Sequence, residues 1–259
     1  MEYKEKLERC FSLMDITTLK SEDTPSSVRA FVEKINALPA HFPSCPLPAA
    51  ICVYPNFSSV VRETLRVPVK VAAVAGAFPS SQSFLEVKCL ESRMAVENGA
   101  DEVDIVLALN AFLEGDEERA SQEIRAIRQA VGESCHLKVI LETGVLADEE
   151  KIYRASMLAM ESGADFIKTS TGKVPVNATP EAARVMCRAI ADYYAKTGRK
   201  VGFKAAGGIS TAEEALQYMQ IVEEILGPQW LTPSLLRLGV SRLGNSLLSA
   251  MMGEKVNYF

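Results

Sequence analysis

Two lysines end short apolar stretches in the second half of the chain. Lys168 closes the stretch in the run GADFIKTSTGK, and Lys204 closes the one in VGFKAAGG. An amine in an apolar pocket beside another cation loses its proton more readily, and only the neutral amine attacks a carbonyl carbon. The pair therefore predicts a Schiff-base nucleophile, Lys168, with Lys204 as an electrostatic helper on a neighbouring strand.

The alternation of side chains along a strand brings a carboxylate to the same place. In the run EVDIVL (102–107), Asp104 lies on the face opposite the apolar residues, and packing of that apolar face on outer helices turns Asp104 inward with both lysines. A single lysine at a strand end would more simply reach out to water. Two lysines on neighbouring strands, both followed by glycine-containing turns and both facing an aspartate, favour a catalytic site. Glu102 and Lys138 lie deeper and are expected to form a structural ion pair.

The elements that must position these groups alternate along the chain. The apolar runs expected as strands are Ser12–Ile16, Ala49–Val53, Val69–Val74, Glu102–Leu107, Leu137–Leu141, Asp165–Lys168, Val201–Lys204 and Leu235–Gly239. The stretches expected as helices are Pro25–Leu38, Phe57–Arg66, Ser83–Asn98, Glu117–Val131, Asp148–Ser162, Pro180–Thr197, Thr211–Leu226 and Ser241–Met252. Strands that alternate with helices indicate a parallel sheet, and eight such units predict an α/β fold, the closed (β/α)8 TIM barrel, with an extra helix before the first strand.

We expect residues 1–259 to form one domain, since this length suits one barrel. An open doubly wound sheet is the alternative, but no G-x-G-x-x-G motif follows an early strand. Barrel active sites lie at the carboxyl ends of the strands, where both lysines lie. Two helix-to-strand junctions, ENGADEVDIV (97–106) and ESGADFIK (161–168), have similar sequences. We favour a shared turn over an internal repeat, because glycine is the common helix-ending residue.

The composition is that of an acidic globular protein. The net charge of -5 and the pI near 5.3 argue against a general surface for nucleic acid or for a membrane. The N-terminal run MEYKEKLERCF lacks the apolar centre of a secretory signal. Six scattered cysteines without a C-x-x-C pair indicate reduced thiols and a cytoplasmic location. His41 and His136 have no metal-ligand spacing, so we expect neither a zinc site nor a Ser-His-Asp triad.

These features together resemble the deoxyribose-phosphate aldolases, a family of class I (Schiff-base) aldolases. The resemblance covers nearly the whole chain, in the stretches LMDITTL (13–19), AAICVYPNF (49–57), GADEVDIV (99–106), LKVILETG (137–144), ADFIKTSTGK (164–173), VNATPEAAR (176–184) and VGFKAAGG (201–208). It implies that Lys168 forms the imine, and that Lys204 perturbs Lys168 and shares proton transfer with Asp104. It further implies cleavage of 2-deoxy-D-ribose 5-phosphate to glyceraldehyde 3-phosphate and acetaldehyde, without a cofactor or a metal ion.

The phosphate of such a substrate needs backbone N–H groups and positive charge. The turns after the last three strands suit this purpose, as in the usual phosphate site of barrel enzymes. The candidate phosphate-binding residues in these turns are Gly172, Lys173, Gly207, Gly208, Ser241 and Arg242. Thr171, Cys52 and Asp15, which lie in the matching stretches, complete the candidate substrate-binding set. Two interpretations stay open for Arg242, which either points outward or reaches back to the phosphate, and for Cys52, which is either a packed core thiol or faces the barrel mouth.

Several positions depart from the pattern of the family. Ala205 stands where proline is usual, the stretch VAGAFPSSQS (74–83) lacks the usual Asn-Phe-Pro motif, and Arg242 replaces a small hydroxyl residue. Tyr258 is followed by Phe259, whereas bacterial members often end in tyrosine. These departures leave two alternatives open: a Schiff-base lyase for another phosphorylated aldehyde, or a non-catalytic barrel that binds a protein partner or a phosphate ligand. The sequence also leaves open whether the chain forms a homodimer.

Overall fold

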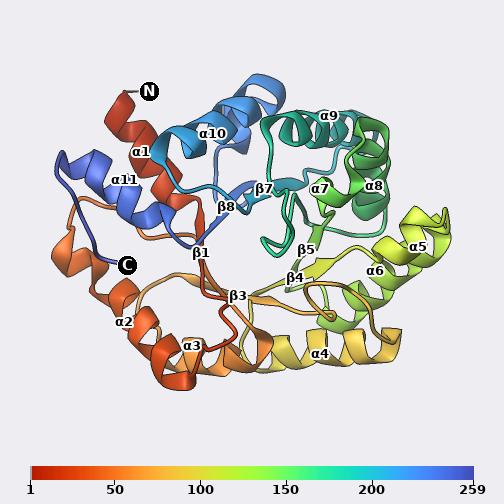
Figure 1. Cartoon of the computed structure of the whole chain (residues 1–259), viewed down its shortest axis with the longest axis horizontal. Helices are drawn as coiled ribbons and strands as arrows, with labels where there is room; N and C mark the ends of the chain where they lie inside the picture. Colours follow the sequence, from red (N-terminus) through yellow and green to blue (C-terminus); the bar gives the residue numbers. More distant parts are fainter. Residues whose placement is uncertain (1) are drawn as a thin grey trace.

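The structure is a computed structural model that describes residues 2–259. Eight parallel strands pair in chain order, and the last pairs with the first, so that they close into a barrel. The strands are β1 (Met14–Thr17), β2 (Ala50–Val53), β3 (Lys70–Val74), β4 (Glu102–Val106), β5 (His136–Ile140), β6 (Phe166–Lys168), β7 (Gly202–Ala206) and β8 (Leu236–Val240). The expected TIM barrel is confirmed (Figure 1).

The helices form a ring around the barrel, and both chain ends lie on the side of the first and last helices (Figure 1). The helices are α1 (Tyr3–Ser12), α2 (Pro25–His41), α3 (Ser58–Thr64), α4 (Leu85–Glu97), α5 (Leu109–Leu113), α6 (Glu117–Val131), α7 (Thr143–Leu146), α8 (Glu149–Glu161), α9 (Pro180–Thr197), α10 (Ala212–Leu226) and α11 (Leu243–Met252), with 3-10 turns η1 (Pro55–Phe57) and η2 (Pro228–Trp230). The expected N-terminal helix is α1. Among residues 2–259, no helix is both long and apolar enough to cross a bilayer.

The strands end within two residues of the expected positions, whereas some helices differ more. The helix expected over Phe57–Arg66 is wrong in extent: the chain first forms the 3-10 turn η1 at Pro55, and the shorter helix α3 follows. Proline pre-sets the backbone angle of such a first turn, which explains why helical structure begins earlier than expected. Helices α5 and α7 are short turns after β4 and β5, and the pattern of apolar residues does not reveal them.

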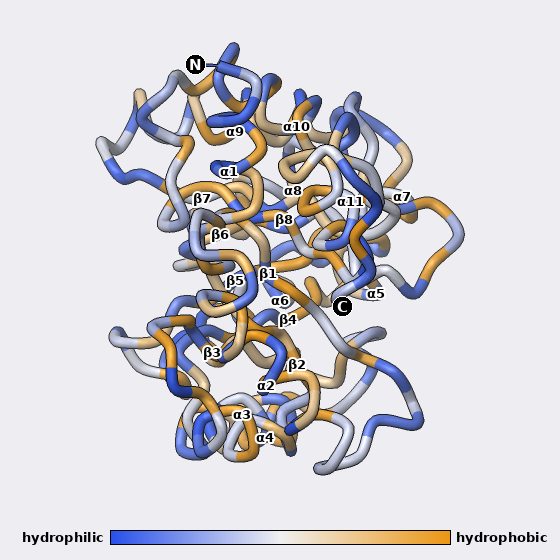
Figure 2. Tube along the Cα trace, turned by 90° about the vertical axis from the view of Figure 1, so that its left-hand side faces the viewer, coloured by the Kyte–Doolittle hydropathy of each residue, from blue (hydrophilic) through white to orange (hydrophobic). Residues whose placement is uncertain are grey.

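The side chains of the strands divide between an outer and an inner face, as their alternation predicts. Val103, Ile105, Ile167 and Phe203 are buried in the apolar core that includes the helices. A separate apolar cluster lies on the inner face of β2 and β3 and consists of Ala50, Cys52, Ala72 and Val74. Figure 2 shows hydrophobic segments along the strands and hydrophilic ones mainly on outer loops and helix turns. The inner face of β2 and β3 is therefore apolar, and the buried charges inside the barrel come from the other strands.

The two similar helix-to-strand junctions form the same turn. Gly99 and Gly163 have positive φ angles of 100° and 103°, which favour glycine. Two residues later, the carboxylates of Asp101 and Asp165 each accept a hydrogen bond from a backbone N–H of the preceding strand, at 2.8 Å and 2.9 Å. Each carboxylate also pairs with an arginine of an outer helix. The shared sequence therefore has a local purpose, since it ties the start of one strand to its neighbour.

Candidate active site

The barrel has a cavity at its mouth, where the strands end. Its volume is about 320 Å³, and its lining comes from the turns after β1, β6, β7 and β8. The residues singled out in the sequence that line it are Lys168, Thr171, Gly172, Lys173, Gly207, Gly208, Ser241 and Arg242. The structure thus brings the predicted nucleophile and all six candidate phosphate-binding residues to one cavity.

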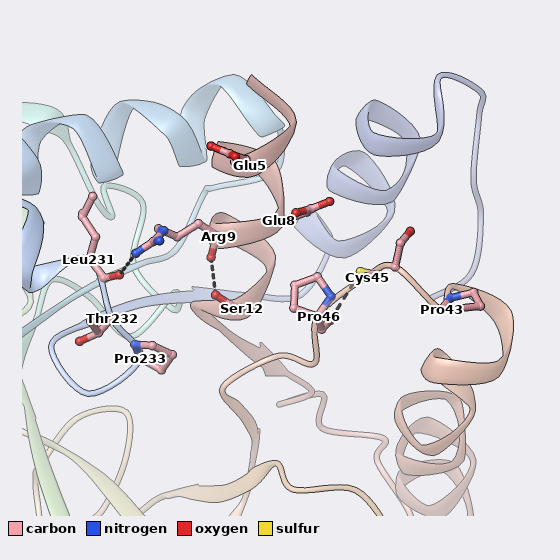
Figure 3. A pocket seen from close by; sticks show the side chains of 11 residues that line it. Glu5, Glu8, Arg9, Ser12, Pro43, Cys45, Pro46, Leu231, Thr232 and Pro233 are labelled. Atoms are coloured by element: carbon pink, nitrogen blue, oxygen red, sulfur yellow. Dashed lines mark hydrogen bonds between the residues drawn. The ribbon is translucent and has the colours of Figure 1, made fainter. Parts of the chain in front are cut away.

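A larger groove lies at the opposite end of the barrel, before the strands begin, and Figure 3 shows the side chains that line it. Its volume is about 830 Å³, and it runs between α1 and the turns that precede β2 and β8. In its wall, Arg9 donates to the Leu231 carbonyl at 2.9 Å, and the Ser12 hydroxyl donates to the Arg9 carbonyl at 2.8 Å. The first contact ties α1 to the turn before β8, the second lies within α1, and this end of a barrel generally serves stability. The larger volume therefore does not make this groove the candidate active site, because the buried reactive groups lie toward the mouth cavity.

Lys168, Asp104 and Lys204 meet at the floor of the mouth cavity. The two lysines are direct partners across β6 and β7. Lys168 Nζ donates to Asp104 Oδ2 at 2.9 Å, and Lys204 Nζ donates to the same oxygen at 2.8 Å. Lys204 and Asp104 are fully buried, whereas Lys168 keeps 4% of its surface exposed and lines the cavity. This arrangement leaves Lys168 as the amine that a substrate in the cavity can reach.

The two lysines differ in how readily they lose a proton. Burial lowers the pKa of Lys168, and neighbouring Lys204 lowers it further, although Asp104 acts in the opposite direction. Burial also acts against the charge of Lys204, but Asp104 and Asp15 outweigh it and raise the pKa of Lys204. Lys204 therefore stays a cation, while Lys168 more readily becomes the neutral amine. These directions support the roles expected for the pair.

A second layer of charges lies beneath this cluster. Lys138 Nζ donates to Asp104 Oδ1 at 2.9 Å and lies 2.6 Å from Glu102 Oε2. Arg237 makes a bidentate contact with Glu102, through Nη1 at 3.0 Å and Nη2 at 2.7 Å. Arg237 Nη1 also donates to Asp15 Oδ1 at 2.5 Å. The expected ion pair of Glu102 and Lys138 is therefore present, and it belongs to a larger network.

Two members of this layer differ from what the sequence suggests. The resemblance groups Asp15 with the substrate-binding residues, whereas the structure buries it fully, outside the lining of the mouth cavity. Asp15 Oδ2 lies 2.5 Å from Lys204 Nζ without an aligned hydrogen bond, so it acts on Lys204 mainly by its charge. Arg237 was not among the site residues expected from the sequence. It lies between two leucines in the run LRLGV, and because side chains alternate along a strand, this pattern could have predicted that Arg237 points into the barrel.

The inner face of β2 adds an apolar wall to the site. Cys52 lies in the apolar cluster of that face, against which Tyr54 and Phe78 pack. Burial raises the pKa of the Cys52 thiol, although Lys204 acts in the opposite direction. Cys52 was interpreted either as a packed core thiol or as a thiol that faces the barrel mouth. The structure gives it a feature of each, since it is packed in an apolar cluster and lies in the barrel interior with the lysines.

The turn after β6 is held by a group that the sequence does not reveal. The Thr171 hydroxyl donates to Glu142 Oε2 at 2.5 Å, and the Thr171 backbone N–H donates to Glu142 Oε1 at 3.1 Å. Glu142 itself has a left-handed backbone, with φ at 55°. Lys173 Nζ donates to the Leu19 carbonyl at 2.7 Å, which links this turn to the turn after β1. Glu142 thus orients Thr171, and Lys173 connects two sides of the cavity.

The other candidate residues form the rim at the ends of β7 and β8. Gly207 and Gly208 have positive φ angles of 87° and 85°, and a side chain at Gly207 would meet Asn177 at 2.7 Å. Ser241 and Arg242 are exposed at the start of α11, and the first backbone N–H groups of a helix have no partner within the helix. Such N–H groups attract anions, so the rim suits a phosphate.

Comparisons with known proteins agree with this site. A family model described as "DeoC/LacD family aldolase" matches residues 10–224. The deoxyribose-phosphate aldolase of Homo sapiens is 43% identical over 247 residues, which cover 91% of this chain and 77% of that protein. A Caenorhabditis elegans protein provisionally assigned to the same enzyme is 43% identical over 252 residues, covering 96% of this chain and 82% of its own length. The solved deoxyribose phosphate aldolase of Aeropyrum pernix, described as a unique tetramer, has a TM-score of 0.69 and 25% identity, over 96% of this chain and 98% of that one.

The burial of Asp104 among lysines predicts how acid destabilises the protein. Burial acts to raise the pKa of Asp104, but its lysine contacts outweigh burial and hold this pKa well below its usual value. Such a carboxyl stabilises the fold above the pKa it has in the unfolded chain, and this stability is lost as the pH falls through the folded pKa. We expect the free energy of unfolding to fall below about pH 4, and to fall less steeply in Asp104→Asn, by up to about 1.4 kcal/mol per pH unit. Urea unfolding at several acidic pH values measures both slopes, and equal slopes would contradict the expectation.

Proposed function

The chain belongs to the DeoC/LacD aldolase family and is therefore an aldolase, and we propose that it cleaves 2-deoxy-D-ribose 5-phosphate reversibly to D-glyceraldehyde 3-phosphate and acetaldehyde. The observation that carries this proposal is the reachable amine of Lys168, on the floor of a cavity whose rim suits a phosphate. The human relative, which bears the name of that enzyme, supports the choice of substrate.

Lys168 supplies the nucleophile and the electron sink. Its neutral amine adds to the C1 aldehyde of the open-chain sugar, and loss of water gives a protonated imine. The C2–C3 bond then breaks, and its electron pair moves toward the imine to form the enamine of acetaldehyde. The C3 hydroxyl loses its proton and becomes the aldehyde of glyceraldehyde 3-phosphate, which leaves the cavity.

Asp104 and Lys204 serve the proton transfers. Asp104 stays ionised beside Lys168 and accepts the C3 hydroxyl proton, directly or through a water molecule. The enamine then takes a proton at C2, and water releases acetaldehyde and restores the free amine. Lys204 stays a cation, fixes Asp104 through its hydrogen bond and lowers the proton affinity of Lys168.

The polar rim and the apolar wall suit the two ends of a 2-deoxy sugar phosphate. The glycine-containing turns after β6 and β7, with Lys173 and Arg242, present N–H groups and positive charge to a phosphate. The apolar cluster around Cys52 suits the C2 methylene and the methyl group of acetaldehyde. A substrate with a hydroxyl at C2 would bury that hydroxyl against apolar side chains, which is costly.

A second candidate function is Schiff-base cleavage of another phosphorylated aldehyde. The altered turn after β3 favours it, because Phe78 from that turn packs against Tyr54, with ring centroids 6.4 Å apart, and belongs to the apolar wall. A non-catalytic barrel has no such observation in its favour, since Lys168, Lys204 and Asp104 lie in direct contact. Comparing 2-deoxyribose 5-phosphate with a panel of phosphorylated aldehydes decides between the two enzymatic functions.

We also propose that residues 1–259 act as one domain in the cytoplasm. A single closed barrel takes its strands from Met14 through Val240, which supports one domain. All six cysteines are free thiols, which supports a reducing compartment. Fluorescence microscopy of the tagged protein tests the location, and limited proteolysis tests the single domain.

Homodimer formation through α4 is a further part of this proposal. The side chains of Phe84, Val87, Leu90 and Met94 form an apolar stripe and are between 45% and 79% exposed, beside a shallow cavity of about 250 Å³. Monomeric proteins rarely expose large contiguous apolar patches. A second copy is the fitting partner, because a stripe on one helix can pack against itself across a two-fold axis. The tetrameric Aeropyrum pernix relative supports self-association.

Lys168 is expected to carry the imine, because its amine is reachable from the cavity and that of Lys204 is fully buried. Borohydride reduction with acetaldehyde should add an ethyl group to Lys168, located by peptide mass spectrometry. Lys168→Ala should reduce cleavage of 2-deoxyribose 5-phosphate, coupled to detection of glyceraldehyde 3-phosphate, by roughly 10⁴-fold. Lys173→Ala is the matched control at the same mouth and should keep the label on Lys168. A label on another lysine would contradict the assignment.

Arg242 is expected to contact the substrate phosphate, since it lines the cavity at the start of α11. A charge-assisted contact of this kind contributes about 1.5–3 kcal/mol. Arg242→Ser should therefore raise KM for 2-deoxyribose 5-phosphate roughly ten- to a hundredfold. Steady-state kinetics with unphosphorylated 2-deoxyribose is the control and should change little. Equal effects on both substrates would place Arg242 outside phosphate recognition.

The apolar stripe on α4 predicts how the oligomer can be broken. The wild type should sediment at twice the chain mass of 28.2 kDa. Val87→Glu combined with Met94→Glu should sediment as a monomer, because the two new carboxylates of each copy would be buried against those of the other. Leu113→Glu changes a similarly exposed leucine on α5 and should leave the dimer intact. A monomeric wild type would refute this assembly.

A further inference from the structure

Seven charged side chains are buried together inside the barrel, and each is at most 4% exposed. The carboxylates are Asp15, Glu102 and Asp104, and the cations are Lys138, Lys168, Lys204 and Arg237. Three carboxylates therefore face four cations. Three of the cations suffice to balance the carboxylates, and one positive charge is left over.

The contacts show which cation is left over. Six of the side chains form a closed ring of alternating charge, hereafter the charge ring. In order, the charge ring runs through Asp104, Lys138, Glu102, Arg237, Asp15 and Lys204, and returns to Asp104. Each cation of the charge ring contacts two carboxylates at 3.0 Å or less. Lys168 contacts Asp104 alone, at 2.9 Å, through an oxygen that Lys204 also uses.

We propose that Arg237 is a positioning residue for the aldolase reaction, because it closes the charge ring and so leaves Lys168 without a carboxylate of its own. The inference rests on the proposed role of Lys168 as the nucleophile. With Lys168 neutral, the buried groups sum to zero charge. With Lys168 protonated, they carry one net positive charge in a medium that solvates charge poorly. Charge balance thus favours the neutral amine.

An arginine suits this position better than a lysine. The guanidinium keeps its proton at any pH at which the enzyme works. Burial acts against the charge of Arg237, but Asp15 and Glu102 outweigh burial and raise its pKa still further. The side chain is also fixed in place by its bidentate contact with Glu102 and by the Phe166 ring, whose centroid lies 5.6 Å from the guanidinium carbon. The charge ring therefore cannot relieve an imbalance by losing a proton at Arg237.

Other titratable or charged groups lie around the charge ring and Lys168: Lys70, His136, Cys52, Glu142, Lys20, Lys173 and Arg242. Lys70 and His136 approach Glu102 from the outside, at 3.2 Å and 3.5 Å, and both are partly exposed, so water screens them. Because His136 contacts Glu102, a carboxylate of the charge ring, it receives a control variant in the test below.

Removal of single charges from the charge ring tests the proposal through the sign of the effect. Glu102→Gln leaves a surplus positive charge. In the pH profile of imine formation at Lys168, it should move the acidic limb to lower pH by about one unit, the order of effect expected for a unit charge that is near but not in contact. Arg237→Met leaves a surplus negative charge and should move the limb to higher pH by about the same amount. Arg237→Lys keeps the charge and should keep the limb in place.

The measurement follows imine formation with acetaldehyde, which has no ionisable group. Cyanoborohydride traps the imine, and mass spectrometry quantifies the ethyl group on Lys168 from about pH 5 to 10, a range that includes the window in which the lowered pKa lies. Each variant is compared with the same variant carrying His136→Gln, which should leave the limb where it is. Circular dichroism confirms that each variant folds.

Opposite shifts in Glu102→Gln and Arg237→Met support the proposal, because a structural defect has no reason to reverse its sign. Shifts in the same direction, or a loss of amplitude with the limb in place, would overturn it. Where Arg237→Met does not fold, the double variant with Glu102→Gln restores the balance of charge, and its limb should return to the wild-type position. Absence of the label from wild-type Lys168 would overturn the proposed function itself, whereas a normal label with unmoved limbs would overturn only this inference.

Discussion

A buried amine can act as a nucleophile only if nothing nearby holds its proton, and this constraint governs the interior of the barrel. In the proposed cleavage an ionised carboxylate beside the amine serves as the base, and such a carboxylate would ordinarily raise the pKa of the amine. The structure resolves the conflict by sharing the charge of Asp104. Its two oxygens contact Lys138 and Lys204 as well as Lys168. Asp104 therefore stays ionised, while most of its attraction is already satisfied by cations other than Lys168, the proposed nucleophile.

The fold places the buried ions inside the barrel and the apolar core that stabilises the protein outside it. Burying an ion costs several kcal/mol, which good contacts only partly offset. The core between barrel and helices is continuous and apolar, and it takes the outward side chains of the strands. Small residues such as Ala50 and Ala72 fill the inner face of β2 and β3 and leave the ions on the other strands. The helices can thus hold the barrel closed while its interior remains ionic.

The sequence predicted that Asp104, Lys168 and Lys204 lie together, but it did not predict the charge ring to which Asp104 and Lys204 belong. Alternation along single strands was enough to turn Asp104, Lys168 and Lys204 toward one another, because each signal is local. Arg237 is different, because its role depends on a contact with Asp15, which is 222 residues away in the sequence. Only the pairing of β8 with β1 brings the two residues together. Asp15 shows the same limit: the resemblance brought it into the site, but its depth follows from a register that pairs it with Ala50 and Gly239. The position of the Glu142 side chain depends on a left-handed backbone conformation, which no pattern of residue types predicts.

Three positions at which this chain departs from the pattern of its family leave the charge ring untouched. Ala205 points outward into the apolar core, Arg242 lies exposed on the rim, and the turn at 74–83 contributes Phe78 to the apolar wall. All three positions lie outside the charge ring. Arg242 is exposed on the rim, so its replacement leaves no buried charge unbalanced. A residue of the charge ring has two buried partners of opposite charge, so its replacement leaves both unbalanced and alters the charge around Lys168. These departures from the pattern of the family therefore leave the buried charges intact, and Arg242 is the one of the three that lines the mouth cavity.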